Sequence, residues 1–110
     1  MSDQAATSAL AKAEAAVAEA KATRAAIGSR LGLAKARVEK MRRAKGPKAL
    51  AAATGDQAAR DALARANESL LRSGLELEDL TEAERQAAAK VGEAEAALAV
   101  LRDRKRGRSD

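Results

Sequence analysis

The sequence predicts an all-α protein, an antiparallel two-helix coiled-coil hairpin with a short connecting helix. Three observations support this prediction. Apolar residues recur every three or four positions in both halves of the chain, the apolar content is mostly alanine, and a Gly-Pro pair and a Thr-Gly-Asp turn signal lie close together near the middle. Two hairpins of this kind can associate into a four-helix bundle.

The apolar repeat is the most specific of these signals. In steps of three and four, nine of ten positions along residues 10–41 are apolar, and ten of twelve along residues 63–101. An average spacing of about 3.5 keeps one stripe of each helix turned toward a partner helix. We name this stripe the helix seam; its larger members are Leu10, Val17, Ile27, Leu31, Val38, Met41, Leu63, Leu70, Leu77, Leu80, Val91, Leu98 and Leu101.

The middle of the chain carries the predicted connection. Lys45-Gly46-Pro47 is typical of a helix end, and Asp56 is placed to cap the helix that follows. Between them, residues 47–54 are expected to form the short connecting helix. The predicted elements are a helix over residues 4–45, a connector over 46–55 and a helix over 56–104.

These elements are expected to form one domain over residues 1–104, followed by a flexible basic tail over residues 105–110. A break in the second helix near residues 74–81 is a competing architecture, because Ser73-Gly74 can end a helix and Thr81-Glu82-Ala83-Glu84 matches a capping box. The heptad phase continues through this stretch, which favours a continuous helix.

Two charged residues, Arg24 and Glu84, interrupt the helix seam. Facing residues are expected to have numbers that sum to about 104 or about 111, and either register brings these two close together. Two arrangements stay open. The side chains form an ion pair, which specifies the register at some cost in stability, or both extend outward to water.

The composition argues against an enzyme. The chain has no His, Cys or Tyr, so the common general bases and activated nucleophiles are missing. The acidic residues between 76 and 84 lack the histidine of a dimetal site in a helical bundle and do not have the spacing of a calcium loop. We expect no catalytic residue, no metal, no cofactor and no small-molecule substrate.

Two basic segments are candidates for nucleic-acid contact, because Lys and Arg neutralise phosphates. They also suit the C-terminal ends of helices, and the chain has no aromatic residue on which a base could stack. The net charge of +5 is uneven: residues 1–55 carry eleven Lys/Arg against four Asp/Glu, and residues 56–101 five against ten, which favours internal pairing. The candidate contacts are Lys40, Arg42, Arg43, Lys45, Lys48, Arg102, Arg104, Lys105, Arg106 and Arg108.

The stretch that joins the two alanine-rich halves carries a short motif, Ala53-Thr54-Gly55-Asp56-Gln57-Ala58-Ala59-Arg60. It resembles alanine-rich coiled-coil proteins encoded in phage and prophage gene clusters. Such sequences often have proline after the aspartate, where this chain has Gln57. The resemblance covers the middle third of the chain and implies an accessory role in virion assembly or DNA packaging.

Three functions follow as hypotheses. A structural or assembly protein that acts through helix–helix association is favoured, with a second copy or a larger protein as its partner, because a thin seam leaves a lone hairpin marginally stable. A nucleic-acid-binding accessory protein and an adaptor that docks on a larger protein are the alternatives. The large apolar residues outside the seam that remain available for association are Leu33, Leu50, Leu71, Leu75 and Val100.

The location of the protein is also predicted from its apolar runs. None of them approaches the length needed to cross a membrane, and residues 1–4 lack the start of a signal peptide. We expect a cytoplasmic or virion-associated protein that is not exported by a signal peptide and has no membrane partner.

Overall fold

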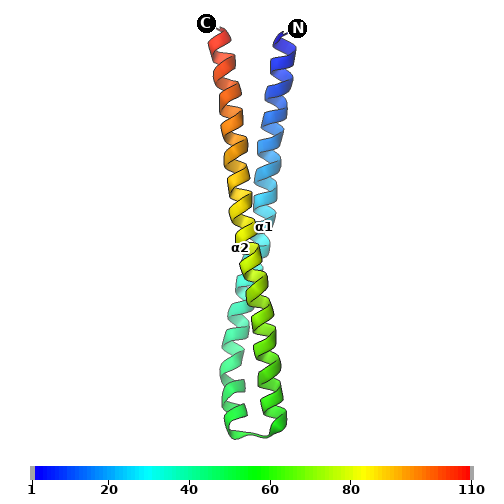
Figure 1. The fold of residues 1–110 in the computed structure, drawn as a ribbon, viewed down its shortest axis with the longest axis vertical. Helices are drawn as coiled ribbons and strands as arrows, with labels where there is room; N and C mark the ends of the chain where they lie inside the picture. The colour runs from blue at the N-terminus through cyan, green and yellow to red at the C-terminus, as the bar shows by residue number, and fades with distance from the viewer. Residues whose placement is uncertain (1, 110) are drawn as a thin grey trace. The chain divides into compact units, whose positions relative to one another are not determined.

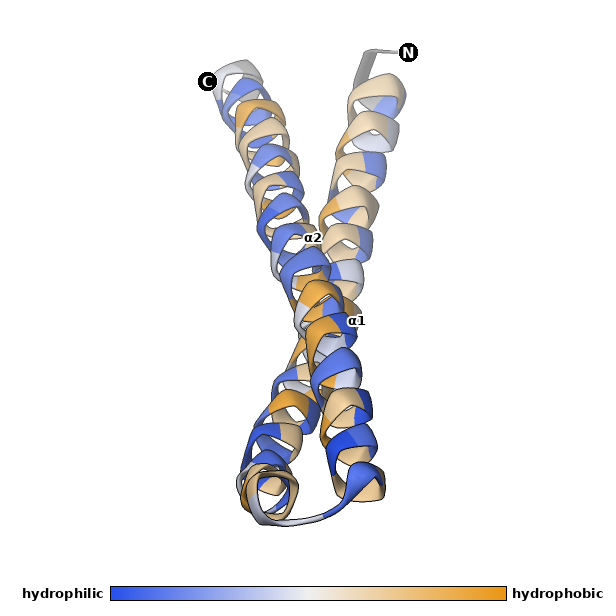
Figure 2. Ribbon diagram, turned by 60° about the horizontal axis from the view of Figure 1, so that its bottom comes forward, coloured by the Kyte–Doolittle hydropathy of each residue, from blue (hydrophilic) through white to orange (hydrophobic). Residues whose placement is uncertain are grey.

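The computed structural model describes residues 2–109, and the side chains of residues 4–107. In this part of the chain there are two α-helices and no strands: α1 (Ser2–Thr54) and α2 (Gln57–Ser109), joined by a short turn (Figure 1). Hydrophobic and hydrophilic residues are interspersed along both helices (Figure 2). The predicted all-α, two-helix fold is confirmed.

The contacts between α1 and α2 fall into two compact units. The turn unit is Ser29–Glu82 and contains the end of α1, the turn and the start of α2. The terminal unit pairs α1 up to Gly28 with α2 from Ala83 onward. The single domain predicted over residues 1–104 stays a prediction, because the structure defines each unit by itself.

Within the terminal unit the two helices run antiparallel. Arg24 of α1 contacts Glu84 of α2, and Glu14, which is earlier in α1, contacts Arg102, which is later in α2. Opposite chain directions are the only way to satisfy both contacts. In the turn unit the direction is the same, because Met41 of α1 lines a groove with Ser69 of α2, while Arg30, earlier in α1, lines one with Leu80, later in α2.

The turn is shorter than predicted, because α1 does not end at Lys45. It continues through Gly46 and Pro47 to Thr54, so the expected connector over residues 46–55 is reduced to two residues. Pro47 has no N–H to donate to the carbonyl of Arg43, but alanines and a leucine on its C-terminal side favour the helix strongly. Gly46 has no Cβ to clash with the proline ring, which relaxes the usual restriction on the preceding residue.

The two-residue turn is held by Gly55 and Asp56. The Asp56 carboxylate accepts a hydrogen bond from the Ala59 backbone N–H at 3.1 Å, and the Asp56 carbonyl accepts one from Arg60 at 3.2 Å. Asp56 is therefore the N-cap of α2, as predicted. A Cβ on Gly55 would lie 2.5 Å from the carbonyl oxygen of Ala51, so only glycine fits here. At the end of α1, the Thr54 hydroxyl donates to the Leu50 carbonyl at 3.0 Å.

The second helix has no break near residues 74–81. The Thr81 hydroxyl donates to the carbonyl of Leu77, one turn earlier in the same helix, at 2.8 Å, so it does not cap a new helix. The predicted continuity of this helix is confirmed. The expected flexible tail is helical as far as Ser109, because arginine and lysine are good helix formers; Asp110 lies outside the described residues.

We predict that Pro47→Ala raises the free energy of unfolding by at least about 1 kcal/mol, and by up to about 3 kcal/mol, because it restores a hydrogen bond inside α1. Thermal and urea unfolding followed by circular dichroism at 222 nm measures the change. In a flexible connector the same substitution would lower stability, because proline restricts the unfolded chain. A loss of stability would therefore contradict the continuous helix.

We predict that Gly55→Ala lowers the free energy of unfolding by more than about 1 kcal/mol, because the new methyl group would clash with the Ala51 carbonyl. Gly92→Ala is the matched control. A Cβ at Gly92 meets nothing within 4 Å, so this substitution is expected to add about 1 kcal/mol through helix propensity. Equal effects of the two variants in the same unfolding assay would show that the turn tolerates a side chain.

Candidate functional site

The helix seam is where the structure buries apolar side chains. The buried hydrophobic residues are Val17, Val38, Ala87, Val91 and Leu98, all positions of the predicted stripe. The other predicted leucines, Ile27 and Met41 are half-buried, so none of the thirteen predicted members is exposed. Ser73, a polar member of the stripe, is also buried, with 9% of its surface exposed. The most buried side chains of the described residues thus lie where α1 and α2 pack against each other.

Two ion pairs between α1 and α2 in the terminal unit indicate the register in which the helices pair. The residue numbers sum to 116 both in Glu14–Arg102 and in Lys21–Glu95, so the same register holds at both pairs. With facing residues that sum to 104, Arg102 would lie twelve residues, or about 18 Å, beyond the residue facing Glu14. With a sum of 111 it lies five residues, or about 7.5 Å, beyond, which long side chains can span. The pairs favour the second predicted register.

The turn unit has the same register. Thr54 and Gln57 bracket the two-residue turn, so facing residues near it have numbers that sum to 111. Val38 and Ser73 have this sum, and both are buried. A small serine opposite a valine allows the two helices to lie close together.

The Arg24 and Glu84 side chains form an ion pair. Arg24 Nε donates to Glu84 Oε1 at 3.1 Å, while the two side chains stay 49% and 30% exposed. The pair therefore lies at the edge of the helix seam rather than in its interior, which resolves the two alternatives left open by the sequence. Its exposure limits its contribution to a fraction of a kcal/mol, about 0.5 kcal/mol.

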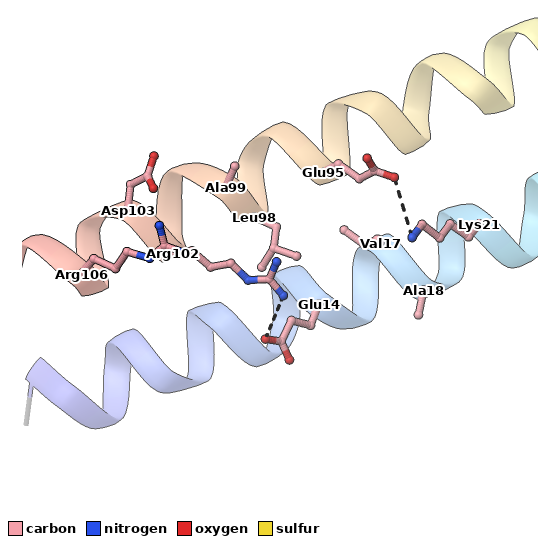
Figure 3. Close-up of a pocket in the computed structure, with 10 residues that line it drawn as sticks. All are labelled: Glu14, Val17, Ala18, Lys21, Glu95, Leu98, Ala99, Arg102, Asp103 and Arg106. Atoms are coloured by element: carbon pink, nitrogen blue, oxygen red, sulfur yellow. Dashed lines mark ion pairs between the residues drawn. The ribbon is translucent and has the colours of Figure 1, made fainter.

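A groove about 760 Å³ in volume runs along one flank of the terminal unit (Figure 3). Val17 and Leu98 of the helix seam line it, together with the Glu14–Arg102 and Lys21–Glu95 ion pairs at 3.8 and 3.9 Å. All four charged side chains are more than half exposed. The groove is thus the flank of a coiled coil, lined by two pairs of opposite charges that stay exposed to water.

Sequence reasoning missed these flanking ion pairs. Glu14 and Lys21 each follow a seam position of α1 by one residue, and Glu95 and Arg102 do the same in α2. Residues at this position lie beside the seam and pair across antiparallel helices. Testing both registers for opposite charges at such positions would have found the two pairs.

The basic residues predicted to contact nucleic acid do not form one surface. In the turn unit, Arg42 and Lys45 line one groove, Lys48 lines another, and Arg43 pairs with Glu39 at 3.2 Å. Lys40 is exposed and lines neither groove. The five basic side chains of this segment therefore lie on different sides of the helix and not on one face.

The second basic segment is partly engaged within the chain. Arg102 pairs with Glu14, and Lys105 has a partner of its own. Arg106 lines the groove of Figure 3, and Arg104 is exposed. The side chain of Arg108 lies outside the described residues. Internal partners compete with phosphate for these cations, which weakens the case for a nucleic-acid site.

No cluster of metal ligands and no membrane-spanning helix is found in the part of the chain that the structure describes. No group of three or more acidic side chains there is placed to hold a metal ion, and the sequence has no His or Cys. Neither of the two described helices has an apolar stretch that could cross a membrane. In comparisons with protein families, curated proteins and solved structures, no match to this chain was found.

We predict a coupling energy of about 0.5 kcal/mol between Arg24 and Glu84. It would be measured by a double-mutant cycle of Arg24→Ala, Glu84→Ala and the double variant, with urea unfolding at low salt and at high salt. Salt should reduce the coupling, because the pair is partly exposed. Additive effects of the two substitutions at low salt would show that the pair does not contribute to stability.

Proposed function

We propose that this chain is a non-enzymatic structural or assembly protein that works through association between helices, with a second copy as its first partner. The observation that carries the proposal is the division of its apolar side chains. The helix seam buries five of the described apolar residues, only one of them a leucine, while four leucines and one valine outside it stay at least half exposed: Leu33, Leu50, Leu71, Leu75 and Val100.

The thin seam makes further association favourable. No described side chain is completely buried, and the best-covered residues are valines, a leucine and an alanine. Small domains that bury so little usually need disulfides, metals or oligomerisation, and this chain has no cysteine. Covering an exposed leucine contributes about 1.5–3 kcal/mol, so contact between helices of two copies is the simplest source of the missing stability.

The composition supports the same proposal from the chemical side. A chain without His, Cys or Tyr lacks the usual means of acid–base and nucleophilic catalysis. If the phage resemblance of residues 53–60 reflects a shared origin, the assembly concerned is that of a virion. A larger docking partner and DNA are the competing partners, and both are tested together with self-association.

We predict that the full-length chain self-associates across the micromolar range, measured by sedimentation equilibrium with and without duplex DNA. The expected result is a mass above that of one 11.4 kDa chain, unchanged when DNA is added. A chain that stays monomeric and fully helical would overturn the proposal. A mass increase only with DNA, lost at high salt, would replace it with the nucleic-acid function.

A further inference from the structure

One groove of the turn unit combines exposed leucines with unpaired charges. Its apolar part consists of Val38, Leu70, Leu71, Gly74 and Leu75. Leu71 is 66% exposed and Leu75 is 53% exposed, although both are leucines one helical turn apart on the same face of α2. A stripe of this kind is typical of a helix face that packs against another helix.

Gly74 stands between the two exposed leucines. It is half-buried, whereas the other glycines of the described region are exposed. A Cβ at Gly74 would meet nothing within 4 Å, and its backbone has no positive φ. The fold of one chain therefore does not require glycine here, although glycine costs about 1 kcal/mol relative to alanine inside a helix. Gly74 differs from the other described glycines in being half-buried beside exposed leucines, and the missing Cβ there leaves room for a second helix to approach.

The charges of this groove lie at opposite ends. In the register of the turn, Lys45 lies level with residue 66 and Arg42 level with residue 69, both toward the turn from Gly74. Glu78 lies one helical turn beyond Gly74 on the other side. Among the described residues, Arg42, Lys45 and Glu78 form no ion pair.

This arrangement is self-complementary under a twofold rotation. The level midway between Arg42 and Glu78 falls between positions 73 and 74 of α2. A twofold axis through that level brings the basic end of each copy against the acidic end of the other and places Leu71 of one copy near Leu75 of its partner. Two copies in the parallel orientation would instead set like charges against each other.

We propose that two copies of this chain associate through the Leu71–Gly74–Leu75 groove, antiparallel about a twofold axis close to Gly74. Arg42 and Lys45 of each copy pair with Glu78 of the other, and the four helix segments form a four-helix bundle. This proposal rests on the self-association proposed above and specifies its surface, its symmetry and its charge pairs.

A complementary pair of charge variants tests the symmetry, with the full chain in every case. Glu78→Arg alone places arginine against Arg42 and Lys45 of the partner, and Arg42→Glu with Lys45→Glu places three carboxylates together. Each variant by itself is expected to dimerise at least about tenfold more weakly than wild type in sedimentation equilibrium. An equimolar mixture of the two variants is expected to regain dimers, because each cation again meets a carboxylate.

The outcomes separate this surface from self-association in general. If wild type dimerises and the separate variants dimerise equally well, or if the mixture fails to recover, the groove is not the interface while the proposed function stands. If wild type is monomeric, both proposals fail. Circular dichroism of each variant verifies that its helices are intact.

Gly74→Ala tests the close approach. It is expected to make the single chain more stable through helix propensity, yet to weaken dimerisation at least about tenfold, because the added methyl group lies between the two copies. Gly92→Ala is the matched control and is expected to leave dimerisation unchanged. A Gly74→Ala chain that dimerises as tightly as wild type would overturn the placement of the axis.

Discussion

The structure depends on packing along the helix seam, and the seam is narrow. It contains no aromatic side chain, and its buried members are valines, one leucine, one alanine and one serine. Small side chains let two helices lie close together, but each buries little apolar area. The specificity of the pairing therefore comes from elsewhere: from the turn, which sets where the two helices begin, and from charges beside the seam, which match in one register and not in the other.

The turn is the most strictly determined part of the chain. Gly55 is the one described glycine whose hydrogen cannot be replaced by a methyl group without a clash, and Asp56 caps the helix that starts beside it. A two-residue connection is too short to let one helix slide by a heptad, about 10 Å, along the other. The charge asymmetry of the two halves supports the same register, because Lys21 and Glu95, like Glu14 and Arg102, come together only when the helices pair at a sum of 111.

The sequence predicted the fold well because a heptad repeat is a long-range pattern with many independent positions. The apolar seam residues from Leu10 to Leu101 are all buried or half-buried. The predicted end of the first helix at Lys45 was wrong, because one local stop signal opposed the weaker helix propensities of many neighbouring residues. Gly46-Pro47 is a strong helix stop by itself, but helix-forming neighbours on both sides outweigh it. The two ion pairs beside the seam could not be assigned before the register was known. A shift of the register by one heptad places a different residue opposite each charged side chain. At Gly74 the sequence indicated only that glycine lowers the stability of the helix, and it gave no reason for a glycine at that position.

The two-residue turn also determines the order in which the chain can fold. Residues beside it are close in sequence, whereas Arg24 and Glu84 are 60 residues apart and Glu14 and Arg102 still further. The entropy lost on closing a loop grows with its length, so the distant pairs form cheaply only after the nearer ones have shortened the loop between them. Contacts between the two helices should then form first beside Gly55–Asp56 and extend toward the chain ends. On heating, the contacts near the chain ends should be lost first.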